Sequence, residues 1–145
     1  MNYNKDYDLV EIRRFNLLTW KDRLTFEIPI NDDFDSIRLR YIYYLTDTIN
    51  LLTISLKLLN LDCNLLKYQT DDNQTHNYFY STILDTRQSI AVYTENISEP
   101  IHLHRVHNGL KQLEYEIYIN DLSSHSGITS SNRVICAIEF LKKKF

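Results

Sequence analysis

The chain has 145 residues, a formal net charge of −3 at pH 7 and two cysteines. A chain of this length usually forms one domain and buries a core without disulfides or metals, so we expect one domain over residues 1–145. The small negative charge argues against a dedicated nucleic-acid-binding protein, whose affinity comes from clustered Lys and Arg.

Apolar and polar residues alternate along most of the chain, which is typical of strands with one buried face. After a polar arm at 1–8, this pattern predicts strands at 9–18, 24–30, 37–45, 51–61, 65–69, 78–84, 89–93, 101–106, 110–120 and 134–141. A basic tail follows at 142–145. These segments predict an all-β fold of about nine or ten short antiparallel strands, a sandwich or a barrel.

Individual residues predict further details of several strands. The pattern slips near Arg13 and Arg14, as a bulge would cause, and Pro29 places its strand at a sheet edge. In 37–45 we expect Ile37, Leu39, Tyr41, Tyr43 and Leu45 to share one face. The leucine-rich segment 51–61 is compatible with a helix, but Thr53 and Ser55 alternate with apolar residues and favour a strand. Asn108-Gly109 predicts a tight hairpin turn.

The sequence indicates a soluble protein made in a reducing compartment. No apolar run approaches the roughly 18 residues of a membrane span, and the polar N-terminus lacks the apolar core of a signal peptide. Cys63 and Cys136 lack a CxxC partner, and Cys136 falls on the apolar face of its strand. We therefore expect Cys136 to be a buried free thiol.

The histidines around the Asn108-Gly109 turn are the strongest candidates for a metal site. His102 and His104 alternate on one strand and, with His107, could supply three zinc ligands, with Glu114 or Glu116 across the turn. The spacing alone is a weak motif. A solvent-facing or partner-facing surface is the preferred interpretation, so no metal or cofactor is expected.

Other catalytic patterns are weaker still. The aspartates 32, 33, 35, 71 and 72 mostly fall in turns, where Asp usually bonds to the backbone. The serines near His125 lie in a polar loop without a G-x-S-x-G turn. Two glycines cannot build a phosphate-binding loop. We therefore expect a protein that is not an enzyme and has no catalytic residues.

Arginines and tyrosines suggest a binding surface. Arg13, Arg14, Arg38, Arg40 and Arg105, with neighbouring tyrosines, would suit single-stranded nucleic acid or a protein partner, because Tyr and Arg are enriched at protein interfaces. The low net charge favours the protein partner. The residues we expect at this interface are Tyr41, Tyr43, Tyr44, Arg38, Arg40 and Tyr118, together with the loops 70–76 and 121–132.

Residues 110–140 carry a resemblance. The pattern is Leu110-x-x-Leu113-x-Tyr115-x-Ile117-x-Ile119-Asn120-Asp121, then Gly127, then Asn132-x-Val134-Ile135-x-Ala137-Ile138-x-Phe140. It resembles the C-terminal hairpin of small β-sandwich minor capsid or cement proteins of large icosahedral double-stranded DNA viruses and virophages. Upstream, Phe34-Asp35-Ser36-Ile37-Arg38-Leu39-Arg40-Tyr41 is similar to their early strand. The resemblance implies a jelly-roll-like sandwich without catalytic residues or cofactor.

The first hypothesis is therefore a virion structural protein, made in the host cytoplasm, that binds neighbouring capsid proteins in homo- or hetero-oligomeric contacts. The second is a β-barrel module that binds a small ligand or carbohydrate, with Trp20 and tyrosines as stacking platforms. A closed, filled core favours the first hypothesis, and a lined cavity favours the second. The third is a metal-dependent enzyme at His102 and His104.

Overall fold

The computed structural model describes residues 5–18, 24–27, 34–46, 51–59, 61, 63–69, 73–88, 91–96, 98–103, 112–120, 122–123 and 133–144. Within these ranges the chain is all-β and contains no α-helix. The strands are β1 (Tyr7–Leu18), β2 (Leu24–Glu27), β3 (Ser36–Leu45), β4 (Leu51–Leu58), β5 (Leu66–Gln69), β6 (Thr75–Tyr78), β7 (Tyr80–Asp85), β8 (Ala91–Glu95), β9 (Ile101–His102), β10 (Gln112–Ile119), β11 (Leu122–Ser123) and β12 (Arg133–Lys143).

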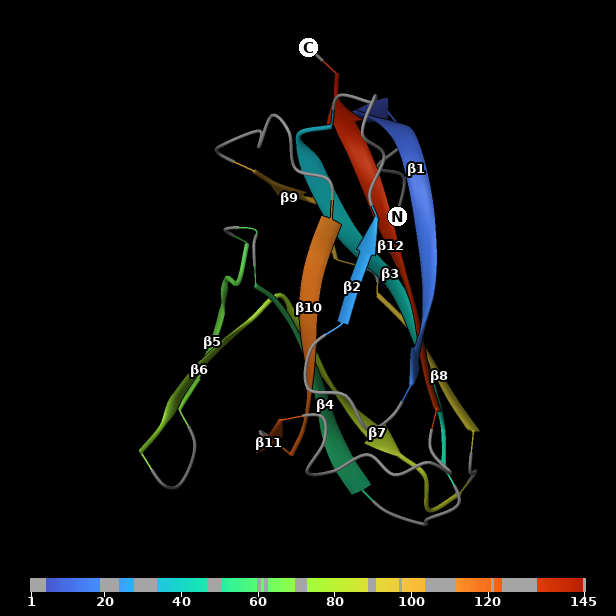
Figure 1. The fold of residues 1–145 in the computed structure, drawn as a ribbon, viewed down its shortest axis with the longest axis vertical. Coiled ribbons are helices and arrows are strands. Elements are labelled where there is room, and N and C mark those ends of the chain that lie inside the picture. Colours follow the sequence, from blue (N-terminus) through green and yellow to red (C-terminus); the bar gives the residue numbers. More distant parts are fainter. Residues whose placement is uncertain are drawn as a thin grey trace.

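The strands form two facing antiparallel sheets and a separate hairpin (Figure 1). Sheet A has the order β1-β12-β3-β8, with β9 also paired to β3. Sheet B has the order β11-β10-β4-β7, with β2 also paired to β10. The β5–β6 hairpin forms a two-stranded sheet of its own, which projects from the side of the sandwich (Figure 1).

The pairing is that of a jelly roll. The main strands in chain order are β1, β2, β3, β4, β7, β8, β10 and β12. The first pairs with the last, β2 with β10, β3 with β8, and β4 with β7. This is one long hairpin of paired strands rolled into two sheets, which defines the jelly-roll sandwich. The predicted fold class is therefore confirmed.

The hydrophobic core lies between the two sheets. Alternate residues of both sheets point into it, as the period-2 pattern requires. Phe15 of β1 contacts Tyr115 of β10 with ring centroids 4.6 Å apart, and Phe34 meets Phe140 at 5.0 Å. The fully covered members of the core include Ile37, Leu39, Ile42, Ile54, Leu56, Leu58, Leu84, Val134, Cys136, Ile138 and Phe140.

Most expected strands are present, with shifted ends. Residues 51–58 form a strand, β4, whose side chains alternate in burial over most of its length, so the preferred interpretation of this segment is confirmed. In β10, Tyr115, Ile117 and Ile119 are buried and the residues between them are partly exposed, as predicted. The expected strand at 78–84 is divided at Phe79 into β6 and β7. Pro29 and the Asn108-Gly109 turn lie outside the described residues.

The bulge expected near Arg13 and Arg14 lies earlier, between Leu9 and Glu11. Beyond it, Glu11 and Arg13 lie opposite the core residues Phe140 and Ile138 of β12. Because opposite residues of an antiparallel pair point to the same face, these two charges point inward on an edge strand. A bulge and inward-pointing charges both hinder the addition of another strand, so β1 is a poor site for strand pairing with a partner.

The predicted bounds of the polar arm and the basic tail are wrong where these segments meet the strands. Tyr7 and Asp8 belong to β1 and pair with Lys143 and Lys142 of β12. Asp35, which is buried, accepts a hydrogen bond from the backbone N–H of Lys143 at 2.9 Å. Lys142 and Lys143 are therefore part of sheet A. The reason is that β12 continues past its apolar run and gains backbone hydrogen bonds from β1.

Two buried groups, Cys136 and Tyr115, have raised pKa values. Both cysteines are buried free thiols. Burial raises the pKa of the Cys136 thiol above its ordinary value of 9.0, and burial is also the main cause that raises the pKa of the Tyr115 hydroxyl above 10.0. A group whose pKa is raised by folding makes its full contribution to stability below its ordinary pKa. That contribution is lost as the pH rises toward the pKa of the folded state.

We expect the free energy of unfolding to fall as the pH rises above about 9. Urea unfolding at a series of alkaline pH values measures this loss. Tyr115→Phe removes one ionisable group and should reduce the slope, whereas Ile83→Ala, at an exposed side chain that does not ionise, should leave it unchanged. A stability that is flat across the alkaline range would contradict the prediction.

Candidate interaction surface

The outer face of sheet A carries a regular grid of side chains. Phe15, Cys136 and Ile42 lie in one row across β1, β12 and β3 and point into the core. The two adjacent rows therefore point outward, because side chains alternate along each strand. One row is Arg14, Ala137, Tyr41 and Glu95, and the other is Asn16, Ile135, Tyr43 and Tyr93.

Aromatic and charged side chains frame a shallow hollow on this face. The rings of Tyr41 and Tyr93 lie 5.3 Å apart, and Tyr93 is 56% exposed. The hollow has a volume of about 600 Å³ and is lined by Ile12, Arg14, Arg40, Tyr41, Tyr93 and Glu95. Tyr and Arg are enriched at protein interfaces, where rigid aromatic rings contribute contact area. The arrangement fits the contact surface of a protein partner.

A bulge in β3 decides which tyrosines reach this face. The register with β12 shifts so that Ala137 faces Tyr41 while Ile138 faces Leu39, which leaves Arg40 without an opposite residue. One extra residue reverses the alternation beyond it. Tyr41 and Tyr43 therefore point outward, although the sequence pattern placed them on the same face as Ile37 and Leu39.

The same shift corrects one of the predicted interface residues. Tyr44 is 2% exposed and belongs to the core cluster, so its side chain is not available to a partner. The structure places Tyr41, Tyr43 and Arg40 on the outer face of sheet A. Arg14, one of the arginines suggested for a binding surface, also lies on this face. Tyr93 and Glu95 complete it but were not predicted, because these residues come together only through strand order and register.

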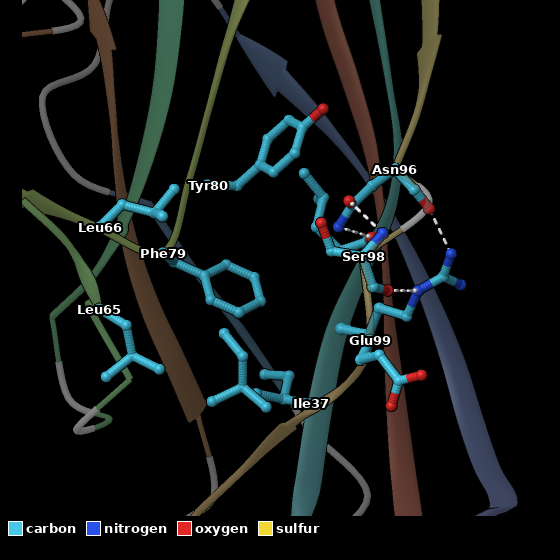
Figure 2. Close-up of a pocket in the computed structure, with 11 residues that line it drawn as sticks. Ile37, Leu65, Leu66, Phe79, Tyr80, Asn96, Ser98 and Glu99 are labelled. Carbon is cyan, nitrogen blue, oxygen red and sulfur yellow. Dashed lines mark hydrogen bonds between the residues drawn. The ribbon is translucent and has the colours of Figure 1, made fainter. Parts of the chain in front are cut away.

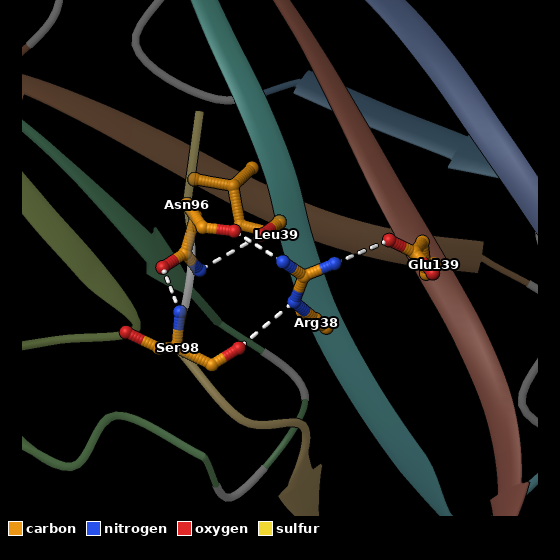
Figure 3. Close-up of polar contacts among 5 residues, drawn as sticks. All are labelled: Arg38, Leu39, Asn96, Ser98 and Glu139. Atoms are coloured by element: carbon orange, nitrogen blue, oxygen red, sulfur yellow. Dashed lines mark hydrogen bonds and ion pairs between the residues drawn. The ribbon is translucent and has the colours of Figure 1, made fainter. Parts of the chain in front are cut away.

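The prediction that Arg38 belongs to the interface is also corrected, because its guanidinium is buried and bonded within the chain (Figure 3). Its Nη1 donates to Glu139 Oε1 at 2.8 Å, and its Nε donates to the backbone oxygen of Ser98 at 2.9 Å. Nη2 donates to the backbone oxygen of Asn96. Arg38 thus ties β3 to β12 and to the segment between β8 and β9, and it serves the fold rather than a partner.

Asn96 organises the interruption between β8 and β9. Its Nδ2 donates to the backbone oxygen of Leu39 at 2.8 Å, and its Oδ1 accepts from the N–H of Ser98 at 2.9 Å. The edge of β3 that faces away from β12 is therefore paired with β8 at one end and with β9 at the other end. The Asn96 side chain bonds to this edge between the two strands. Side-chain amides commonly replace missing backbone partners in this way.

A small apolar pocket lies beside this interruption (Figure 2). Leu65, Leu66, Phe79 and Tyr80 form one wall, and Asn96, Ser98 and Glu99 face them across the opening (Figure 2). Its volume is about 210 Å³. This is below the roughly 300–1,000 Å³ of most small-molecule sites.

Tyr118 lies on the other sheet, away from the outer face of sheet A. Its ring contacts Tyr78 at 5.5 Å and His76 at 6.2 Å, so it packs against the base of the β5–β6 hairpin. His76 stacks on Tyr78 with nearly parallel rings. A lone two-stranded hairpin is marginally stable in water, and this aromatic cluster attaches it to sheet B.

The histidine and the glutamates of the candidate metal site lie on different sheets. His102 is exposed on β9 of sheet A, whereas Glu114 and Glu116 lie on β10 of sheet B, so β9 and β10 do not pair with each other. His104, His107 and Trp20 lie outside the described residues, as do residues 70–72 and most of the loop 121–132. Among the residues that are described, no group of three or more His, Cys, Asp or Glu could hold a metal ion.

The comparisons with known proteins add little to this. No family model and no curated protein matches the chain. Among solved structures, it is similar to a chain of the native virion of Kashmir bee virus at neutral pH, with 8% identity and a TM-score of 0.28. The match covers 94% of this chain and 70% of that chain. A similarity of this size carries no argument about function. The described residues contain no helix long and apolar enough to cross a membrane.

Proposed function

We propose that the chain is a non-enzymatic virion structural protein, a minor capsid or cement protein that binds neighbouring capsid proteins. It acts through the outer face of sheet A and is made in the host cytoplasm before it enters the particle. Its mechanism is burial of the Tyr41, Tyr43 and Tyr93 rings against a partner, with Arg14, Arg40 and Glu95 giving the contact its orientation.

The observation that carries this proposal is the outer face of sheet A on a jelly-roll scaffold. Jelly rolls build viral capsids, lectins and cupins, so the fold alone leaves several functions open. The exposed Tyr and Arg side chains on one flat sheet face favour a protein partner. The resemblance of residues 110–140 to minor capsid proteins points the same way.

The test is the presence of the chain in purified particles. Mass spectrometry of gradient-purified virions should find it at a fixed ratio to the major capsid protein, retained after a high-salt wash. Tyr93→Ala should lower incorporation by about 30-fold, the effect of losing an aromatic contact of about 2 kcal/mol. Ile83→Ala, at a residue of sheet B that is 66% exposed, is the matched control. Absence of the wild-type chain from particles would overturn the proposal.

The pocket of Figure 2 supports one alternative, a module that binds a small ligand or carbohydrate. Its lining is mainly apolar and its rim carries Asn96, Ser98 and Glu99, so an alkyl chain with a polar end would fit. Saturable binding of a medium-chain alcohol, measured by titration calorimetry and lost in Leu66→Arg, would favour this alternative. Heat signals that do not saturate would exclude it.

A further inference from the structure

The outward row across sheet A has opposite charges at its two ends. Arg14 on β1 lies in register with Ala137, Tyr41 and finally Glu95 on β8. Three strand spacings separate the two charges, a distance of about 14 Å. Both side chains are exposed, and neither forms an ion pair or hydrogen bond within the described part of the chain. The row therefore has a positive charge at Arg14, the uncharged Ala137 and Tyr41 in the middle, and a negative charge at Glu95.

Such a row is complementary to itself. When two copies pack face to face about a twofold axis parallel to the strands, their strands have opposite lateral order. The β1 strand of one copy then lies over β8 of the other, and β12 lies over β3. Each Arg14 faces the other copy's Glu95, and the interface contains this charge pair twice.

The shapes along the centre of the face agree with the charges. The twofold axis passes between β12 and β3, so the position of the small Ala137, which its own neighbours cover to 1% exposure, lies opposite the Tyr41 ring of the other copy. In the next row Ile135 lies opposite Tyr43. Large side chains therefore meet small or flat ones, as in the interdigitated packing of two sheets about 10 Å apart.

Two of the neighbouring charges do not oppose this arrangement. Arg38 and Glu139, in the next outward positions, neutralise each other at 2.8 Å and are buried. Strand addition at β1 is hindered by its bulge and by the inward-pointing Glu11 and Arg13. The face of sheet A is therefore a better surface for a second copy than that edge.

We propose that the occupant of the outer face of sheet A is a second copy of this chain, packed face to face with reciprocal Arg14–Glu95 pairs. This inference rests on the proposed function, because it names the partner of the same contact surface. The neighbouring capsid protein bound through this face is then another copy of the same chain.

Charge reversal tests the proposal. Sedimentation equilibrium should show a wild-type dimer, and Arg14→Glu or Glu95→Arg alone should raise the dimer dissociation constant by about tenfold or more, because each creates two like-charge pairs. The double variant Arg14→Glu/Glu95→Arg rebuilds both pairs and should restore the wild-type constant. Lys67→Glu on the exposed β5 strand makes the same charge change as Arg14→Glu and should leave it unchanged.

A second double variant fixes the register. Arg40→Glu/Glu95→Arg has the same composition as the rescuing pair and lies on the same face, but Arg40 is off the row, in the β3 bulge. It should not restore the dimer, and equal rescue by it would overturn the Arg14–Glu95 pairing. Circular dichroism melts of all variants confirm that each is folded.

The two proposals fail in different ways. A wild-type chain that stays monomeric at all concentrations overturns the dimer and leaves the particle experiment unaffected. A dimer with the predicted rescue whose chain is absent from purified virions overturns the structural role alone.

Discussion

Replacement of Arg38 by alanine should lower the free energy of unfolding by about 3–5 kcal/mol, because it leaves the Glu139 carboxylate buried without the guanidinium. Glu139 is 1% exposed in the folded chain, so its carboxylate has little access to water there. The variant also removes the donors to the backbone oxygens of Ser98 and Asn96. Urea unfolding followed by tryptophan fluorescence or circular dichroism measures the loss.

The matched control removes both charges. Arg38→Met/Glu139→Leu leaves no uncompensated charge, and apolar replacements of buried ion pairs are often neutral or stabilising. Most of the stability lost in Arg38→Ala should therefore return. If the double variant is no more stable than Arg38→Ala, the hydrogen bonds to Ser98 and Asn96, and not the charge pair, dominate this site.

Phe140→Ala should have a similar cost, about 3–5 kcal/mol, because it opens a cavity in the centre of the sandwich. Phe140 is fully buried on β12, and its ring meets Phe34 edge to face at 5.0 Å. Thermal and urea unfolding measure the effect. Ile83→Ala, at an exposed residue on the outer face of sheet B, should change stability by less than about 0.5 kcal/mol.

A loss below about 1 kcal/mol for Phe140→Ala would mean that the core collapses around the missing ring. Phe140→Leu separates the two contributions. Leucine retains most of the apolar volume, so its cost should lie between wild type and alanine if packing at this site determines the stability.

Alternation along the strands predicted much of the fold. In β10 every second side chain from Tyr115 to Ile119 is buried, and no other residue interrupts the pattern. The segment 51–58 was ambiguous from composition alone, but its Thr and Ser residues alternate as strand residues do. Period 2 is a local property, and a sequence shows local properties directly.

The contact face was harder to predict because it depends on two non-local properties. A single extra residue at Arg40 reverses the alternation in β3, so Tyr44 enters the core while Tyr41 and Tyr43 leave it. Bulges have no strong residue signature when no glycine marks them. The row from Arg14 to Glu95 also requires strands from opposite parts of the chain to be neighbours in a known register.

Arg38 illustrates the same limit for charges. Its position among arginines and tyrosines suggested a surface, and nothing local distinguishes it from Arg40. Its partner Glu139 is about a hundred residues away, at a sequence separation of 101. Buried charges are paired, so the pair is explained once the two strands are neighbours, but only the fold makes them so.

The pairing of the first and last strands sets how the molecule resists tension. Because Tyr7 lies opposite Lys143, a force applied at these two residues acts on one end of the β1–β12 pair. The strands would then peel apart one residue pair at a time, whereas pulling along the strands loads many hydrogen bonds together. Tyr7 and Lys143 are therefore mechanically weak points of attachment.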